Sequence, residues 1–187
     1  MDDLLEQIAR GNRLPAITAQ QLLGGLGADP PLAGGDVAPV AIRGTEGFMV
    51  NYARCCHPIP GDDIIGYLGK GEGLQIHTQD CKVAFRMLSK DSDKWAGVQW
   101  SKDTNREFDV AITVDTKQGK GVLARVASSI TSADSNILNV SMDDKYKEDS
   151  VTMRFTIQVS NRLHLSRVLR GLRTNSDVFR VIRNRSA

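Results

Sequence analysis

Apolar and polar residues alternate with a two-residue period in several segments of the second half of the chain. Residues 108–115 place an apolar side chain at every second position, and a longer alternation covers residues 151–159. Between such segments, apolar residues recur every three or four positions, which is typical of amphipathic helices. The pattern predicts strand, helix, strand, strand, helix and strand at residues 108–115, 122–130, 137–142, 151–159, 163–172 and 178–182.

This order is that of the ferredoxin-like fold, a four-stranded antiparallel sheet with two helices on one face. Asn161 precedes the second helix and can cap it. Each strand has an apolar face for the helices and a polar face that stays open. The open face has no aromatic side chain to stack on an RNA base, so we do not expect base stacking there. Its residues in the first and third strands are Asp109, Ala111, Thr113, Asp115, Thr152, Arg154, Thr156 and Gln158.

The first 101 residues predict shorter elements. Residues 1–36 predict two short helices, 3–10 and 15–23, and a Gly- and Pro-rich linker, which together are too small to bury a core. The next part predicts a small β-rich module with strands at 38–42, 48–52, 64–68, 74–77 and 95–100, a turn at 55–62 and a helix at 79–88. We therefore expect an α+β chain divided into residues 1–36, 37–101 and 102–187.

The composition is that of an ordinary globular protein, with 41% hydrophobic residues, 25% charged residues and a net charge of +2. No apolar run is long enough to cross a bilayer and no signal-peptide pattern is visible, so we expect a cytoplasmic location without a membrane partner. The chain from Arg162 onward is rich in arginine, which forms either a solvated basic surface or a contact for RNA phosphate. The RNA hypothesis uses Arg162, Arg167, Arg170 and Arg173, with Arg180, Arg183 and Arg185 after them.

The three cysteines are Cys55, Cys56 and Cys81, and His77 lies four residues before Cys81. An odd, clustered set does not fit a disulfide framework, which leaves metal binding or plain burial. Three thiols and one imidazole suit tetrahedral zinc, and a four-residue spacing would place His77 and Cys81 on one face of a helix. His57 is a rival ligand beside Cys56. A nucleophilic Cys–His pair is a third option, but no orienting group or oxyanion site supports it.

Two parts of the chain resemble one known family. Residues 53–81 resemble the conserved-cysteine module, also called a zinc-finger domain, of RelA/SpoT proteins; their sequence is ARCCHPIPGDDIIGYLGKGEGLQIHTQDC. The double cysteine before x-Pro-x-Pro-Gly-Asp and the later Ile-His-x-x-x-Cys are distinctive of that module. The ACT domain of the same proteins is similar to the segments FDVAITVD, GVLARVASSI and SNILNVSM. The helical segment upstream of the module resembles MDDLLEQIARGNRLP, so the likeness covers nearly the whole chain.

The resemblance implies the C-terminal regulatory region of a bifunctional guanosine tetraphosphate synthetase/hydrolase. Such a region would transmit ribosome, tRNA or amino-acid status to N-terminal catalytic domains in the stringent response. It implies a structural zinc ion held by Cys55, Cys56, His77 and Cys81. It also implies an amino-acid site, often across an ACT homodimer, at Gln118, Gly119, Lys120, Gly121, Val122, Asn136 and Ile137. Asp134 departs from the glycine that is frequent in the family, although aspartate tolerates left-handed backbone.

Two other functions remain as alternatives, a stand-alone ACT-type amino-acid sensor and a zinc-dependent hydrolase. The chain has neither a His-Asp metal-hydrolase pattern nor a P-loop, so we assign no catalytic residue and expect no turnover from this region. A catalytic zinc ion keeps one coordination position open, and four protein ligands would close it. The sequence therefore favours a structural site over a hydrolytic one.

Overall fold

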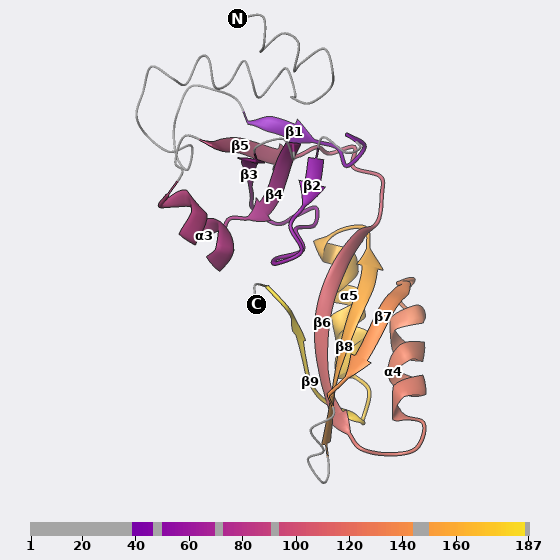
Figure 1. The fold of residues 1–187 in the computed structure, drawn as a ribbon. Helices are drawn as coiled ribbons and strands as arrows, with labels where there is room; N and C mark the ends of the chain where they lie inside the picture. Colours follow the sequence, from indigo (N-terminus) through magenta and orange to yellow (C-terminus); the bar gives the residue numbers. More distant parts are fainter. Residues whose placement is uncertain (1–38, 47–49, 70–72, 91–93, 144–149, 186–187) are drawn as a thin grey trace, which may run out of the picture. The chain divides into compact units, whose positions relative to one another are not determined.

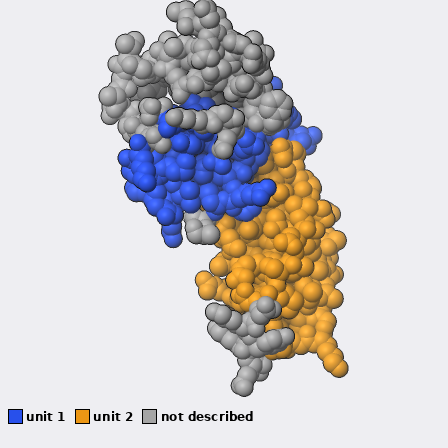
Figure 2. Space-filling view, viewed as in Figure 1, with its two compact units in different colours: residues 1–58, 62–105, 186 blue, residues 59–61, 106–185, 187 orange. Residues whose placement is uncertain are grey.

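The computed structural model describes residues 39–46, 50–69, 73–90, 94–143 and 150–185. The helices predicted at 3–10 and 15–23 and the linker after them lie outside these residues. The described chain forms two compact units (Figure 2): one contains the residues up to Pro58 and Asp62–Asn105, and the other contains Ile59–Gly61 and Arg106–Arg185. No helix among the described residues has the length and apolar character needed to cross a bilayer.

The first unit is built on a five-stranded sheet with the order β1-β5-β3-β4-β2. Its elements are β1 (Val40–Ile42), β2 (Val50–Tyr52), β3 (Ile64–Gly69), β4 (Gly73–Thr78), α3 (Lys82–Leu88) and β5 (Trp95–Trp100). The predicted hairpin is present as the antiparallel pair β3–β4, in which Gly69 is the partner of Gly73. The two short strands β1 and β2 pair in parallel with β5 and β4, which the local pattern did not predict.

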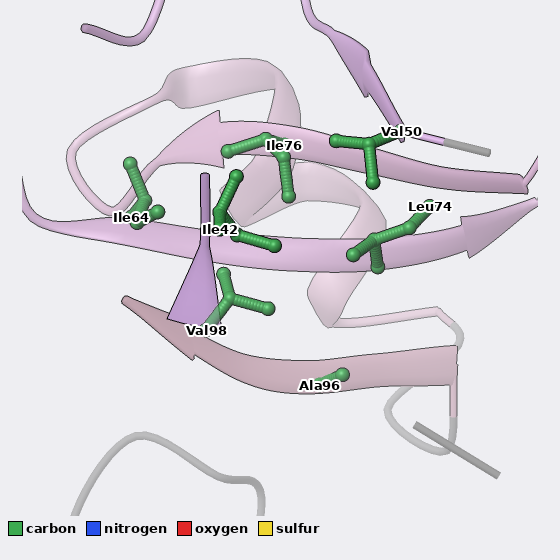
Figure 3. Close-up of a cluster of buried hydrophobic side chains, with 7 residues drawn as sticks. All are labelled: Ile42, Val50, Ile64, Leu74, Ile76, Ala96 and Val98. Atoms are coloured by element: carbon green, nitrogen blue, oxygen red, sulfur yellow. The ribbon is translucent and has the colours of Figure 1, made fainter. Parts of the chain in front are cut away.

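One face of this sheet encloses an apolar core to which all five strands contribute (Figure 3). The core contains Ile42, Val50, Ile64, Leu74, Ile76, Ala96 and Val98. Tyr52 of β2 stacks on Trp100 of β5, with ring centroids 5.8 Å apart. Two strands separate β2 from β5, so their axes would be about 14 Å apart in a flat sheet. The short ring distance indicates that the sheet curls around the core, which lets a module of this size bury apolar surface.

The opposite face of the same sheet is covered by α3 and by the turn that follows β2. Ile65 and Trp95 pack there against Ala84 of the helix, together with the buried Cys56 and Cys81. Ile64 and Ile65 point to opposite faces because successive strand residues alternate, so β3 serves both cores. The cysteines therefore belong to a second, smaller core between the sheet and α3.

The second unit has the predicted order of elements and an antiparallel sheet with the strand order β7-β8-β6-β9 (Figure 1). Its elements are β6 (Phe108–Lys117), α4 (Val122–Thr131), β7 (Ile137–Met142), β8 (Ser150–Val159), α5 (Arg162–Arg173) and β9 (Val178–Arg183). This is the expected ferredoxin-like arrangement, so the α+β assignment is confirmed.

Alternation decides which face of this sheet is buried. Every second residue of β6 from Phe108 to Val114 is buried, and β8 buries Met153, Phe155 and Ile157 on the same side. The helices add the apolar stripes Val122, Val126, Ile130, Leu165, Val168 and Leu172. Asn161 caps α5 as predicted, because its side chain accepts a hydrogen bond of 2.9 Å from the backbone N–H of His164.

Candidate metal centre

Cys55 and Cys56 lie in the tight turn that follows β2, as the sequence predicted. The backbone N–H of Ala53 donates to Ile76 O at 2.9 Å, which extends the parallel pairing of β2 with β4 into this turn. The N–H of His57 closes the turn on Ala53 O at 2.9 Å, and His57 itself has a positive φ of 47°. This turn brings both cysteine side chains to the end of β4.

His77 and Cys81 reach the same place from different elements. His77 is the fifth residue of β4, whereas Cys81 is the N-cap of α3. The expectation that both project from one helix is therefore wrong, because strand pairing with β3 extends through Thr78 and the helix begins only at Lys82. A turn in which Cys81 N–H donates to Thr78 O at 3.1 Å brings Cys81 back towards His77.

Four ligand atoms meet at this point, the Sγ atoms of the three cysteines and a ring nitrogen of His77. All lie within 4.8 Å of one another. Cys55 Sγ is 3.5 Å from Cys81 Sγ and 3.9 Å from Cys56 Sγ, and His77 Nδ1 is 3.5 and 3.8 Å from the sulfurs of Cys55 and Cys56. The rival ligand His57 is not a member of this cluster.

These separations match the spacing of ligands around a tetrahedral zinc ion. Zinc binds thiolate sulfur at about 2.3 Å and imidazole nitrogen at about 2.0–2.1 Å, so two sulfurs are about 3.8 Å apart and sulfur and nitrogen about 3.6 Å apart. The three thiols and one imidazole are also a common donor set for structural zinc. The residues of this chain therefore fit a zinc ion in both donor type and spacing.

Burial opposes ionisation of the cluster in the absence of a cation. It raises the pKa of Cys56 to about 12 and raises the pKa of Cys55, where Cys81 adds to the effect. Burial also lowers the pKa of His77 to about 4, which keeps the imidazole neutral, the form that binds metals. A divalent cation would compensate the thiolate charges that burial alone disfavours.

Thr78 supplies polar groups that suit a charged sulfur. Its backbone N–H donates to Cys56 Sγ at 3.4 Å, which acts to lower the pKa of Cys56 against the larger effect of burial. Thr78 is only 2% exposed, and its hydroxyl is a buried group without a hydrogen-bond partner among the described residues. A buried hydroxyl without an acceptor is costly, and a metal-bound thiolate would be a strong acceptor beside it.

Neither Thr78 nor Gln75 was predicted from the sequence as part of this site, although Gln75 Oε1 lies 3.0 Å from His77 Nε2. Gln75 could have been found, because residues two apart in a strand share one face and β4 was predicted as a strand. Thr78 could not, because its contact with Cys56 crosses from β4 to the turn after β2. Trp95 was also missed; its ring lies beside that of His77 at a centroid distance of 6.1 Å.

The structure divides the predicted amino-acid site between the two ends of α4. Gly121 is the N-cap of α4, with a positive φ of 77°, and the residues Gln118–Val122 lie around it. Asn136 and Ile137 follow the other end of the helix, at the start of β7. Ten helical residues span about 15 Å, so a single chain does not bring the two groups together. Asp134 adopts the expected left-handed conformation, with φ of 59°.

The four arginines assigned to RNA contact all lie on the solvent side of α5. Arg162, Arg167, Arg170 and Arg173 are exposed, and the opposite side of the helix is buried. Arg167, Arg170 and Arg173 form no salt bridge within the described part of the chain. Charged side chains on the open side of the sheet, in contrast, are hydrogen-bonded to their neighbours. Asp115 accepts from Thr152 Oγ1 at 2.7 Å, and Asp143 accepts from Arg154 at 2.8 Å. The open positions of β6 and β8 carry no aromatic side chain, as expected.

Comparison with known proteins finds two domain families in the chain, one along each of its two compact units. Residues 40–101 match the family model of the RelA/SpoT RIS domain, and residues 104–183 match that of the ACT domain. The chain is 35% identical over all 187 residues to the bifunctional (p)ppGpp synthase/hydrolase SpoT of Escherichia coli K12, of which it covers 26%. It is 33% identical over 148 residues to a GTP pyrophosphokinase of Streptomyces coelicolor, which is 79% of this chain and 17% of that protein.

Among solved structures, the ACT domain from a GTP pyrophosphokinase of Chlorobium tepidum covers 42% of this chain and 99% of its own, at 24% identity and a TM-score of 0.37. The fold and the two matched domains define a class, that of regulatory regions in which a RIS domain precedes an ACT domain. The chain belongs to the RelA/SpoT family, and it is similar to the C-terminal regulatory region of SpoT. It spans about a quarter of the length of SpoT.

Proposed function

We propose that this chain is the regulatory region of a cytoplasmic, bifunctional (p)ppGpp synthetase/hydrolase. Its role would be to transmit a nutritional signal to N-terminal catalytic domains. The chain itself would consist of a helical segment and linker (1–36), the conserved-cysteine module (37–101) and the ACT domain (102–187). The observation that carries this proposal is the 35% identity to SpoT along the entire chain, since SpoT is named for both activities. A stand-alone sensor would not require similarity to the RIS domain as well as the ACT domain.

A chimera tests the regulatory role. The matching region of Escherichia coli SpoT would be replaced by this chain, and synthesis and hydrolysis of (p)ppGpp would be compared with those of SpoT truncated before that region. We expect the chain to change the ratio of the two rates. Equal ratios in the chimera and the truncated protein would contradict the proposal.

We also propose that Cys55, Cys56, His77 and Cys81 hold a structural zinc ion. The ion would connect the turn after β2, the end of β4 and the start of α3, and its four protein ligands would leave no position for a catalytic water. The proximity of the four ligand atoms supports this role over the alternative of a zinc-dependent hydrolase.

Metal analysis and cobalt substitution test the zinc site. We expect about one zinc ion per chain and the absorption of tetrahedral Co²⁺ with three thiolates and one imidazole. His77→Asn should lose the ion, whereas His57→Asn should retain it, because His57 lies outside the cluster and asparagine tolerates its positive φ. A metal-free wild-type protein, or equal loss in both variants, would contradict the assignment.

The amino-acid site is retained as a proposal that requires a homodimer. β7 is an edge strand, and it exposes Leu138, Val140 and Met142. Antiparallel pairing of two β7 strands would bring Asn136 and Ile137 of one copy towards Gln118–Val122 of the other. Calorimetry with proteinogenic amino acids at millimolar concentration, together with sedimentation analysis, tests this. A monomer that gives no heat would count against it.

Contact with ribosomal RNA or tRNA is retained for Arg162, Arg167, Arg170 and Arg173. Their exposure on one side of α5 supports a phosphate-binding surface. Affinity for RNA should decrease linearly with salt on a log–log scale, and the slope should become smaller by about 0.7–0.9 for each arginine replaced by alanine. Binding that is independent of salt would contradict this proposal.

A further inference from the structure

Gln75 lies against the side of His77 that faces away from the sulfurs. The two residues are two positions apart in β4, so their side chains share one face of the strand. Gln75 Oε1 is 3.0 Å from His77 Nε2, while Nδ1 of the same ring is 3.5 and 3.8 Å from the sulfurs of Cys55 and Cys56. The imidazole therefore spans from the amide to the sulfur cluster.

The position of the proton on this ring decides whether His77 can be a ligand. A neutral imidazole carries one N–H and one lone pair on its two nitrogens. If the proton is on Nε2, it is donated to Gln75 Oε1 and the lone pair of Nδ1 points to the sulfurs. If the proton is on Nδ1, it occupies the position that a metal ion would need.

The ring is buried, so no bulk water can stabilise either form. His77 is 1% exposed, and Trp95 packs beside its ring with an interplanar angle of 55°. Gln75 is half-buried, and it provides the hydrogen-bond partner that the structure shows for Nε2. An N–H at this place without an acceptor would carry the cost of an unsatisfied buried group.

We propose that Gln75 is a positioning residue of the metal centre, whose amide oxygen keeps the proton of His77 on Nε2 and thereby presents Nδ1 as the fourth ligand. The inference rests on the proposed zinc site, but its first consequence, the tautomer of His77, exists in the metal-free protein. Gln75 does not touch the ion, so its effect is on the orientation and basicity of His77.

Three variants of the complete 187-residue chain separate this role from a general packing role. Gln75→Leu removes the acceptor at similar volume, and Gln75→Glu retains an acceptor that cannot donate. Gln99→Leu is the matched control, because Gln99 is an exposed residue of β5 in the same unit. Zinc affinity would be measured by competition with a chromophoric chelator. The tautomer of His77 would be read from the ¹⁵N shifts of its ring nitrogens in metal-free protein.

We expect Gln75→Leu to weaken zinc binding by about 10–100-fold and to populate the Nδ1–H tautomer. Gln75→Glu and Gln99→Leu should bind zinc at least as tightly as the wild type and retain the Nε2–H tautomer. Wild-type affinity in Gln75→Leu, an unchanged tautomer in that variant, or an equal loss in Gln75→Glu would overturn the inference. If the wild type bound no zinc, the proposed site would fail, and the tautomer readout would still decide the role of Gln75. If Gln75→Leu failed to fold, the tautomer of His77 in the metal-free wild type would decide the inference, because a proton on Nδ1 there would overturn it.

Discussion

At the scale of single residues, the curled sheet of the first unit depends on a position without a side chain. Gly66 lies in β3, on the face that carries Ile64 and the core. A Cβ atom at this position would lie 2.7 Å from Leu74 Cδ1 and 3.1 Å from Val98 Cγ1. Both neighbours are buried in the core, so they have little room to move. The absence of a side chain lets the side chains of Leu74 in β4 and Val98 in β5 close over β3.

We therefore expect Gly66→Ala to lower the free energy of unfolding by about 1–3 kcal/mol, as overpacking does in other cores. Gly171→Ala is the matched control, since a Cβ atom there would be 3.8 Å from Ser129 O, an ordinary contact. Gly171 is inside α5, where alanine is favoured by about 0.5–1 kcal/mol. Urea unfolding of both variants checks the signs, and a stable Gly66→Ala protein would contradict the packing argument.

At the scale of elements, a buried histidine connects the two helices of the second unit. His164, in the first turn of α5, is 5% exposed. Its Nδ1 accepts from the backbone N–H of Ser160 at 3.2 Å, and its Nε2–H donates to Ala133 O, just after α4, at 2.8 Å. These bonds satisfy the backbone N–H of Ser160 just before α5 and the carbonyl of Ala133 just after α4, where intrahelical partners are missing. The residue has a structural role that its position in the sequence did not reveal.

Replacement of His164 by phenylalanine should destabilise the second unit by about 1–3 kcal/mol, because it leaves Ala133 O and the Ser160 N–H without this partner. Leu163→Ala is the control, since Leu163 is 79% exposed and its loss should change stability by less than about 0.5 kcal/mol. Thermal unfolding followed by circular dichroism would measure both. Equal effects of the two substitutions would show that the hydrogen bonds of His164 contribute little.

At the scale of the whole molecule, the two units carry different spectroscopic probes. The chain has two tryptophans, Trp95 and Trp100, and both lie in the first unit. The second unit contains α4 and α5 and has no tryptophan. Tryptophan fluorescence therefore reports on the unit with the Cys/His cluster, whereas methyl NMR signals of Val126 and Ile130 report on the other. Each unit can be followed separately in the intact chain.

If the proposed zinc ion is bound, its removal should destabilise the first unit alone, because the free energy of binding a structural zinc ion contributes to folding. We expect EDTA to move the fluorescence-detected urea transition to lower concentration and to leave the methyl signals of Val126 and Ile130 unchanged. The His77→Asn protein should not respond to EDTA. An unchanged fluorescence transition in the wild type would contradict a structural role for the metal.

The sequence by itself determined the secondary structure of the second unit and which side of its sheet is buried. Alternation along residues 108–115 and 151–159 is fixed by the covalent order, and only one orientation of these strands turns their apolar face to the core. The hairpin β3–β4 was equally visible, because both strands and their glycine-rich connection are contiguous. The donor types of the proposed metal site were also visible, as three thiols and one imidazole.

Only the tertiary structure decided how those donors meet. The register that pairs Tyr52 of β2 with Ile76 of β4 brings the turn of Cys55 to His77, and no local pattern encodes this parallel pairing. The same register places Thr78 on Cys56, and strand geometry places Gln75 on His77. The division of the predicted amino-acid site between the ends of α4 is also a tertiary result, because a helix separates its ends by its length. Periodicity fixes faces and elements, whereas contacts between distant segments depend on how those elements pair.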